Sequence, residues 1–553
     1  MEERLARELN IDKVLADLMV QRGITTFEEA KKFFRPRIED LHDPFLMKDM
    51  DKAVKRLEQA LQNNENILVY GDYDVDGTTA VALVYLFLHS FYQNITYYIP
   101  DRYAEGYGIS FQGVDFALDN DFSLIIALDC GIKANDKIDY ANERNIDFII
   151  CDHHLPGDQL PDAVAVLDPK RNDCTYPFKE LSGCGIGFKL VQAYAQKNNI
   201  PFENLMCYLD LTAISIAADI VPMVDENRVL AYYGIKQLNK NPRPGVKAIL
   251  KMNKFKRELN ITDVVFVLGP RINAAGRIAS GKNAVEMLIS DTMDAAETTG
   301  KIINQNNLER RDLDVLITRQ ALEMIDEDVK LINRKTTVLF HPEWHKGVIG
   351  IVASRLTEKY YRPTIMLAAA NGKVTGSARS VKDFDVYKAI EACSDLLEQF
   401  GGHKYAAGLT LKLENMDAFA QRFEKVVSDT IEEHMLIPRI EIDARINLSD
   451  INPKFCRILK QFSPFGPENM TPVFLSEGVI DKGYAKLVGT NHLKLDITDP
   501  DNPNISYAAI AFNQGEHLEY ISKKIPFNVC YTIEENEWNS NVSLQLNVKD
   551  IKF

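Results

Sequence analysis

Residues 71–77 read Gly-Asp-Tyr-Asp-Val-Asp-Gly and follow a short apolar run directly. At a strand tip, side chains two residues apart point the same way, so we expect Asp72, Asp74 and Asp76 to share one side. Like charges at this spacing repel strongly unless a cation lies among them. The segment therefore predicts a divalent-metal site and, with it, a metal-dependent enzyme.

Three further acidic or histidine groups follow predicted elements of the same region. They are Asp129, the run Asp152-His153-His154, and Asp219. In an open α/β sheet the carboxyl ends of the strands form the ligand crevice, so we expect these groups to converge. Carboxylates combined with imidazole favour Mn²⁺ over Ca²⁺. The ligands suffice for two ions, with Asp129 placed to bridge them.

Each group alone has a more ordinary explanation. An Asp-x-Asp pair is usually a solvated turn, a lone acid in an apolar helix is more often a cap, and paired histidines are often surface or core residues. Four such groups, each at a strand end of one predicted domain, favour the metal site over four independent coincidences.

The elements that must position these groups are short apolar runs at 67–70, 95–99, 124–128, 148–151 and 163–167. Helical patterns separate them. Continuous apolar runs, rather than strict alternation, are typical of parallel strands covered on both faces. The sequence therefore predicts a doubly wound α/β domain with a parallel sheet.

A chain of 553 residues is too long for a single core. We predict N-terminal helices and the catalytic domain over 1–235, a helical connector over 236–335, a second α/β domain over 336–437, and a small β-barrel over 438–553. We predict the connector from a helix-prone stretch at 282–333. We predict the barrel from short β-like runs separated by turn residues.

Composition and charge bear on the partner that the protein binds and on its location in the cell. The net charge of −15 argues weakly against a nucleic-acid partner, but residues 271–388 carry a small excess of Lys and Arg. A negative partner could be held there and processed at the acidic cluster. The eight cysteines contain no Cys-x-x-Cys pair, which favours reduced thiols and a cytoplasmic location. We expect no membrane span and no secretory signal.

The four motifs at 71–77, 129–131, 152–154 and 218–219 resemble those of the DHH phosphoesterase superfamily. Within it, the order of further motifs resembles that of bacterial single-strand-specific 5′→3′ DNA exonucleases. Those further motifs lie at 100–108, 269–277, 376–380, 401–408 and 464–469. The resemblance covers nearly the whole chain. It implies that the second α/β domain is of the DHHA1 type and that the barrel is an OB-fold.

The resemblance also implies roles for the acidic cluster. It implies that two ions, Mn²⁺ or Mg²⁺, are bound in this cluster. Their ligands would be Asp74, Asp76, Asp129, His153 and Asp219. Asp72 would be a further ligand or a supporting acid, and His154 would touch the scissile phosphate. The expected products are 5′-mononucleotides.

Recognition of the 5′ end is implied for a second set of residues. They are Arg102, Tyr107, Arg277, Ser377 and Arg379, with His403 in a glycine-rich segment whose backbone can approach phosphates closely. Arginine binds phosphate in a bidentate way, and a tyrosine ring can stack a base. For any single arginine, a surface salt bridge is the commoner role. The resemblance further implies single-stranded DNA, a single-strand-binding protein and a repair helicase as partners of a monomer acting in repair and recombination.

Two departures and two rivals accompany this interpretation. Tyr70 stands where related phosphatases often carry a histidine, so we expect Asp72 to compensate for that missing ligand. We also expect no further domain after Phe553. The first rival is a DHH phosphodiesterase acting on short oligonucleotides or cyclic dinucleotides. The second is a non-catalytic DNA-binding scaffold. The barrel and the arginines disfavour the first, and the complete set of acids and histidines disfavours the second.

Overall fold

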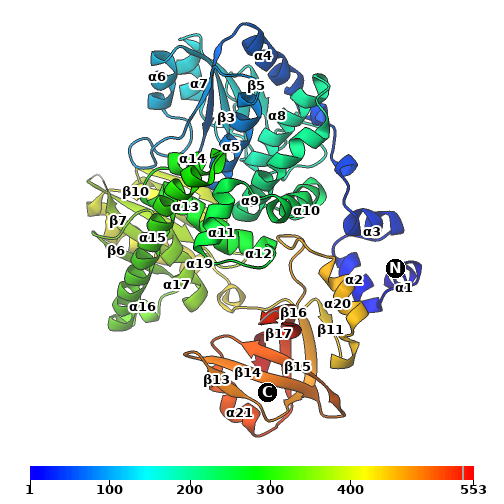
Figure 1. The fold of residues 1–553 in the computed structure, drawn as a ribbon. Helices are drawn as coiled ribbons and strands as arrows, with labels where there is room; N and C mark the ends of the chain where they lie inside the picture. The colour runs from blue at the N-terminus through cyan, green and yellow to red at the C-terminus, as the bar shows by residue number, and fades with distance from the viewer. Residues whose placement is uncertain (371, 539–540) are drawn as a thin grey trace.

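The structure is a computed structural model that describes residues 1–370, 372–538 and 541–553. Figure 1 shows a blue-to-cyan α/β domain above a green-to-yellow second domain, with the orange-red barrel below. None of the described helices combines the length and the apolar character needed to cross a membrane.

The catalytic sheet has five parallel strands in the order β2-β1-β3-β4-β5. They are β1 (Asn66–Gly71), β2 (Ile95–Tyr98), β3 (Phe122–Leu128), β4 (Asp147–Cys151) and β5 (Ala165–Leu167). All five predicted strands are confirmed. The strand order reverses between β1 and β3, and in such sheets the crevice for a ligand opens at the carboxyl ends of those two strands.

Alternate residues of β1 supply two separate cores, which is why its apolar run is continuous. Ile67 and Val69 pack with α4 (Met50–Gln62), α5 (Val75–His89) and α8 (Gly183–Lys197). Leu68 and Tyr70 pack on the other face. That face is covered by α6 (Phe111–Asp119) and α7 (Asn135–Asn142). After α8 the chain forms two further helices, α9 (Leu209–Asp219) and α10 (Asp225–Lys240).

The connector is helical, as predicted, but it is divided. It comprises α11 (Pro244–Met252), α12 (Ile261–Asp263), η4 (Val264–Leu268), α13 (Gly269–Ile278), α14 (Lys282–Ile289), α15 (Met293–Glu327) and α16 (Val329–Ile332). The expected single helical stretch over 282–333 is interrupted because Thr292 caps a new helix, its hydroxyl accepting the Ala295 N–H at 3.3 Å. The 35-residue α15 is the long green helix of Figure 1.

The second α/β domain carries a mixed sheet in the order β6-β7-β8-β10-β9. Its strands are β6 (Thr337–His341), β7 (Thr364–Ala370), β8 (Lys373–Arg379), β9 (Gln399–His403) and β10 (Ala406–Leu411). One face packs on α18 (Val386–Glu391) and α19 (Met416–Thr430). The other packs on α17 (Ile349–Tyr360) and α15, so the connector helix is part of this domain's core.

The C-terminal barrel closes because β12 (Phe474–Asp481) pairs with both β16 (Phe527–Trp538) and β14 (His492–Asp499). The ring continues through β17 (Asn541–Lys552) and β15 (Asn502–Ala511), and β11 (Ala444–Arg445) and β13 (Lys486–Val488) extend the sheet. The helices α20 (Pro453–Lys460) and α21 (Leu518–Ser522) accompany it. The predicted OB-type barrel is confirmed.

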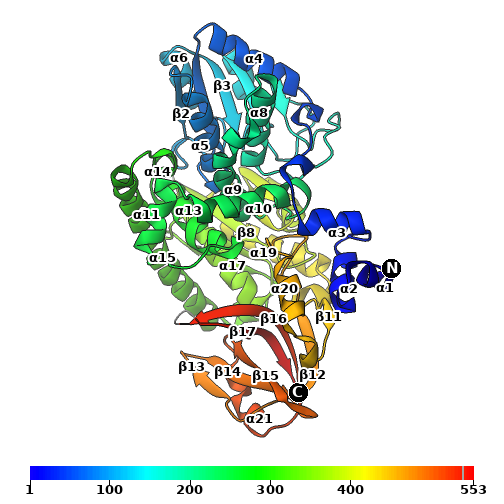
Figure 2. The ribbon, with the colours of Figure 1, turned by 45° about the vertical axis from the view of Figure 1, so that its right-hand side comes forward.

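The first three helices lie against this barrel, although they belong to the opposite end of the chain (Figures 1 and 2). They are α1 (Glu2–Leu9), α2 (Lys13–Gln21) and α3 (Phe27–Phe34). Leu15 and Met19 share a buried core with Phe455 and Phe474. A capping box opens α3: Thr26 accepts from the Glu29 N–H, and Glu29 accepts from the Thr26 N–H.

Candidate active site

The acidic segment spans the turn from β1 into α5. Asp72 directly follows β1 and is fully buried, with the Gly108 N–H donating to one oxygen at 3.3 Å. Asp74 is the N-cap of α5 and accepts the Gly77 N–H at 3.0 Å. Burial, followed by the charge of Asp74, raises the pKa of Asp72 well above its usual value. Burial and the charge of Asp76 likewise raise the pKa of Asp74.

The Asp76 carboxylate is held by the beginning of another helix. The backbone N–H groups of Gly183 and Cys184, which open α8, donate to its two oxygens at 2.7 Å each. The Ser215 hydroxyl of α9 donates to Oδ1, also at 2.7 Å. A helix N-terminus stabilises negative charge, so the beginning of α8 both orients the Asp76 carboxylate and stabilises its charge.

Asp129 follows β3 in a left-handed conformation, with φ of 59°. Its N–H donates to the Cys151 carbonyl at 2.8 Å, which ties the end of β3 to the end of β4. Burial, followed by the charge of Asp76, raises the pKa of Asp129 well above the usual range. Its Oδ1 is buried and has no hydrogen-bond partner within the described ranges.

His153 brings the separate elements together. Its Nε2 lies 3.2 Å from Asp129 Oδ1, 3.6 Å from Asp219 Oδ2 and 3.8 Å from Asp76 Oδ2. Burial lowers the pKa of His153, which favours the neutral imidazole that metals bind. Burial and the charge of Asp76 raise the pKa of Asp219 to about 8.

This donor set fits a divalent ion. Two groups of possible ligand atoms each lie within 4.8 Å of one another: Asp129, His153 and His154, and Asp76, His153 and Asp219. Asp72 and Asp74 adjoin these groups without belonging to either. Buried carboxylates with raised pKa values, and with oxygens such as Asp129 Oδ1 left without a donor, are what a bound cation satisfies.

His154 lies at the exposed edge of the carboxylate cluster, with Nδ1 4.0 Å from Asp129 Oδ1, and is oriented by Asp152. Its Nδ1 lies 2.7 Å from Asp152 Oδ1, and 45% of its side chain is exposed. Burial lowers the pKa of His154, but the hydrogen bond to Asp152 and the charges of Asp152, Asp219 and Asp76 together outweigh it and raise the pKa to about 9. Asp152 belongs to the motif at 152–154, but no role for it was predicted from the sequence. Its position immediately before the two histidines was the available signal.

Tyr107 meets His154 from the other side. Its hydroxyl lies 3.1 Å from His154 Nε2, and it donates to the Asp129 carbonyl at 3.4 Å. The tyrosine remains 56% exposed, with its ring 6.3 Å from that of Tyr73. The structure thus gives the hydroxyl a contact that the sequence did not predict, while base stacking by the ring remains a prediction.

Three predicted arginines converge from three parts of the chain. Arg102 lies over the Tyr73 ring at 4.9 Å, and Arg277 of α13 donates to the Gly347 carbonyl at 3.1 Å. Arg379, at the end of β8, donates to the Ser377 hydroxyl at 3.0 Å. Burial, followed by the charges of Arg102 and Arg379, lowers the pKa of Arg277 to about 10.

These arginines form a positive site beside the negative one. None of the three has a carboxylate oxygen within 4.0 Å in the parts of the chain that the structure describes. His403, at the end of β9, lies between the two sites: burial, then the charges of Arg379 and His154, lower its pKa. A phosphate at the arginines would supply the missing counter-charge.

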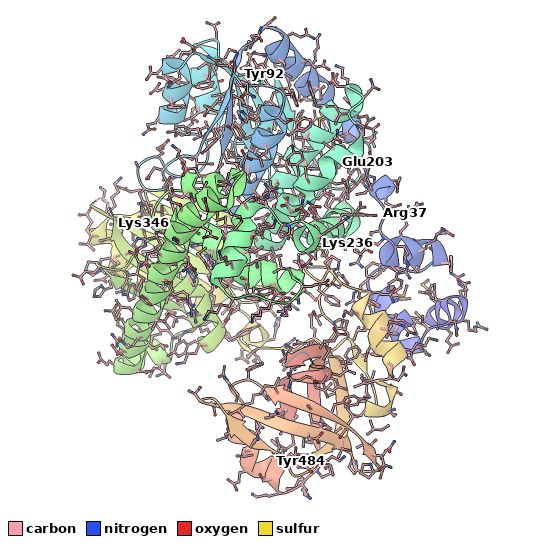
Figure 3. All side chains as sticks on the ribbon, viewed as in Figure 1. Arg37, Tyr92, Glu203, Lys236, Lys346 and Tyr484 are labelled. Atoms are coloured by element: carbon pink, nitrogen blue, oxygen red, sulfur yellow. The ribbon has the colours of Figure 1, made fainter. Side chains whose placement is uncertain are left out.

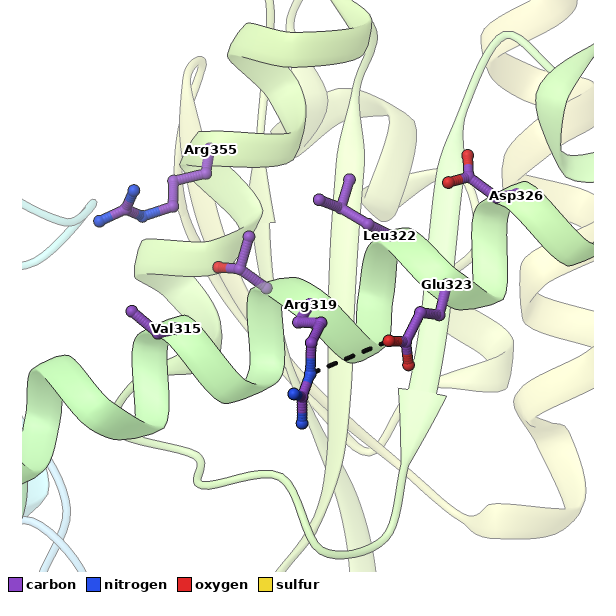
Figure 4. Close-up of a pocket in the computed structure, with 7 residues that line it drawn as sticks. Val315, Arg319, Leu322, Glu323, Asp326 and Arg355 are labelled. Atoms are coloured by element: carbon purple, nitrogen blue, oxygen red, sulfur yellow. Dashed lines mark ion pairs between the residues drawn. The ribbon is translucent and has the colours of Figure 1, made fainter. Parts of the chain in front are cut away.

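A pocket of about 310 Å³ lies elsewhere, between α15 and α17 (Figure 4). It is lined by Val315, Thr318, Arg319, Leu322, Glu323, Asp326 and Arg355. An Arg319–Glu323 ion pair of 3.9 Å crosses its wall. It contains none of the residues that the sequence singled out, and its chemistry gives no reason to place the reaction there.

Comparisons with known proteins agree with this geometry. The family model of the DHH family, N-terminal domain, matches residues 66–216. The DHHA1 domain model matches residues 333–429, and the RecJ OB domain model matches residues 442–550.

Whole-chain relatives extend the agreement. The single-stranded-DNA-specific exonuclease RecJ of Bacillus subtilis is 38% identical over 551 residues, which are 99% of this chain and 69% of that protein. Its namesake in Escherichia coli is 32% identical, across 97% of this chain and 95% of that protein. The crystal structure of RecJ in complex with Mn²⁺ from Thermus thermophilus matches with a TM-score of 0.85 and 25% identity, covering 100% of this chain and 78% of that one. The chain belongs to the RecJ family of DHH proteins.

Proposed function

We propose that this protein is a metal-dependent exonuclease that degrades single-stranded DNA from its 5′ end and releases 5′-mononucleotides. The observation that carries the proposal is the pairing of two sites. A cluster of carboxylates and histidines lies at the switch point of the sheet, and beside it lie three arginines without counter-charges. The relatives named above, which are single-stranded-DNA-specific exonucleases, support it.

We assign the divalent ions to the carboxylate cluster. The ligands would be Asp74, Asp76, Asp129, His153 and Asp219, with Asp72 adjoining them. Mn²⁺ or Mg²⁺ bound there supplies positive charge that acidifies water and neutralises phosphoryl oxygens. The raised pKa values and unpartnered oxygens of this cluster support the assignment, as does the Mn²⁺ in the related structures.

The chain's own groups would orient the strand. His154, held protonated by Asp152, has its Nε2 beside the Tyr107 hydroxyl on the exposed side of the cluster, and it would donate to a phosphoryl oxygen that takes the place of this hydroxyl. Arg102, Arg277 and Arg379 would hold the terminal phosphate, with Ser377 and His403 beside them. Tyr107 would stack the terminal base. A terminal phosphate fixed next to the cluster places the first phosphodiester at the ions, which accounts for cleavage from that end.

The remaining assignments follow from the architecture and the family. The barrel at 438–553 would add affinity for single-stranded DNA through charge and stacking. The division into 1–235, 236–335, 336–437 and 438–553 is proposed as the functional division. We further propose that the protein is a cytoplasmic monomer. It would act in repair and recombination together with a single-strand-binding protein and a repair helicase.

An end-labelled time course tests the polarity and the metal together. The full-length protein is incubated with strands labelled at the 5′ or the 3′ end, with Mn²⁺ or with EDTA, and an Asp129→Ala variant runs in parallel. We expect early release of labelled mononucleotide only from the 5′-labelled strand, only with metal, and not by the variant. Early release of the 3′ label would overturn the polarity, and hydrolysis in EDTA would overturn the mechanism.

A further inference from the structure

Lys346 lies against the arginine site but belongs to none of the motifs singled out in the sequence. It precedes α17, and its Nζ lies 4.3 Å from the centre of the Tyr103 ring. The Tyr103 hydroxyl donates to the backbone carbonyl of Arg277, and Arg277 Nη1 donates to the carbonyl of Gly347. Figure 3 labels Lys346 where the yellow-green second domain meets the green connector.

The packing leaves this turn little freedom. A side chain at Gly347 would come within 2.6 Å of the Arg277 carbonyl and 2.7 Å of the Tyr103 hydroxyl. The imidazole of His345 contacts the same tyrosine, with ring centres 6.0 Å apart. The turn that carries Lys346 is therefore fixed beside Arg277, and the Lys346 ammonium lies over the Tyr103 ring at the edge of the arginine site.

The charge at this position is unbalanced. Lys346 is half-buried and forms no ion pair with any carboxylate of the described residues. Burial, followed by the charge of Arg102, lowers the pKa of Lys346, and the charge of Asp101, which forms no ion pair with it, offsets this only in part. The charge of Arg310 also lowers the pKa of Arg277, and Arg310 has a buried Nε without a hydrogen-bond partner in the described ranges.

One phosphate does not account for this excess. A terminal phosphate carries a charge of about −2 at most, and the three positive charges of the arginines already exceed it. A further ammonium, desolvated and next to them, costs free energy unless another anion reaches it. The anion must lie within the reach of one strand end, because the turn is fixed to Tyr103 and Arg277.

We propose that Lys346 binds a second phosphate group of the strand, adjacent to the terminal phosphate held by Arg102, Arg277 and Arg379. This inference rests on the proposed function and adds a phosphate subsite to it. The second phosphate has two possible sources with the same chemistry. It is either an additional terminal phosphate, as in a 5′-diphosphate end, or a phosphate of the backbone close to that end.

Charge-specific variants test the subsite. Lys346→Gln removes the charge and Lys346→Arg retains it. Lys236→Gln is the matched control, because Lys236 also lies over a tyrosine ring, at 3.9 Å from the centre of Tyr232, but well apart from Lys346 (Figure 3). Binding of a 5′-phosphorylated oligothymidylate is measured by fluorescence anisotropy in EDTA at several salt concentrations, and KM and kcat are measured with Mn²⁺.

We expect Lys346→Gln to weaken binding about fivefold to tenfold and to reduce the slope of log affinity against log salt by about 0.7. KM should rise while kcat stays near that of the unaltered protein, and Lys346→Arg should restore both binding and slope. A Lys346→Gln protein with the affinity, salt slope and KM of the Lys236→Gln control overturns the subsite. An unaltered protein that binds the strand but does not degrade it refutes the proposed function instead, and the anisotropy still decides the role of Lys346.

Two modified strands separate the sources of the phosphate. A 5′-diphosphate end that strengthens binding to the unaltered protein, but not to Lys346→Gln, assigns the subsite to the terminal group. Neutral methylphosphonates near the 5′ end that weaken binding to the unaltered protein, but not to Lys346→Gln, assign it to the backbone. Equal responses of the two proteins to both modified strands contradict the proposal.

Discussion

Asp152 Oδ1 lies 2.7 Å from His154 Nδ1, and the same carboxylate accepts the backbone N–H groups of Ile132, His153 and His154. Burial alone would raise the pKa of Asp152, but these donors and the charge of His154 lower it to about 2. A carboxylate that stays ionised and fixed by three backbone donors sets both the orientation and the proton of its neighbour.

Replacement of Asp152 by Asn should therefore lower the pKa of His154 from about 9 toward or below the ordinary value of about 6.5. NMR titration of the histidine in the metal-free protein measures this directly. At pH 8 we expect kcat to fall about 10-fold to 100-fold, and the loss to shrink toward pH 6. An exposed acid, Asp136→Asn, provides the control. A kcat reduced equally at all pH values would show that Asp152 supports the structure and not the proton of His154.

The acidic cluster makes the stability of the metal-free protein depend on pH. Burial raises the pKa of Asp72, Asp74 and Asp129, and it raises that of Asp219 from about 3.8 to about 8. These folded-state groups bind protons that the unfolded chain has released, so the free energy of unfolding falls as the pH rises from about 4 through about 8. His154, whose pKa is also raised, acts in the same direction up to about pH 9.

Thermal unfolding with and without Mn²⁺ checks this dependence. We expect the Tm of the catalytic domain to fall between pH 5 and pH 8 in EDTA. Mn²⁺ should raise it more at the higher pH, because the ligands must lose their protons to bind. Mn²⁺ at 100 times its Kd should add about 2.7 kcal/mol. A Tm in EDTA that rises over this interval would show that the carboxylates are stabilised by groups other than a cation.

Gly183 offers a geometric test of the metal site. A Cβ at this position would lie 2.6 Å from Asp129 Cβ and 2.7 Å from Asp129 Oδ1, while the Gly183 N–H holds Asp76. Gly183→Ala should displace Asp129, lower Mn²⁺ affinity at least about 10-fold in a calorimetric titration, and reduce kcat. Gly157→Ala, where the nearest atom is 3.7 Å away, should change neither value. Unchanged Mn²⁺ affinity in Gly183→Ala would remove Asp129 from the ligand set.

The sequence was sufficient where local patterns decide the structure. Continuous apolar runs located the strands, and acids at strand ends predicted the convergence, because parallel strands share one carboxyl edge. The break at Thr292 was readable in principle, since a threonine before a helix is a cap signal. Docking of α1–α3 onto the barrel was not readable, because it depends on contacts between opposite ends of the chain. The contacts of the Tyr107 hydroxyl and of Lys346 were not predicted for the same reason, because tertiary packing determines their partners.

The joint between the catalytic domain and the barrel depends on Arg228 of α10. Its guanidinium is buried and donates only to backbone carbonyls, those of Phe33, Gln461, Phe462, Ser463 and Pro464. Burial lowers its pKa to about 9. One side chain thus connects α3, α10 and the segment that follows α20, and a shorter amide cannot reach all of these acceptors.

Arg228→Gln should therefore loosen the joint without changing the metal cluster. Buried carbonyls left without donors cost about 1–3 kcal/mol each, so the barrel should separate more often from the catalytic domain. Limited proteolysis should cut the linker around residues 437–442 faster, and KM for a long strand should rise more than KM for a short one, because only the long strand reaches the barrel. Arg144→Gln, which removes an arginine lying over the half-buried Tyr140 ring, is the control. If Arg228→Gln raises KM equally for both strands, Arg228 acts on the catalytic domain itself, since loss of the barrel alone would spare the short strand.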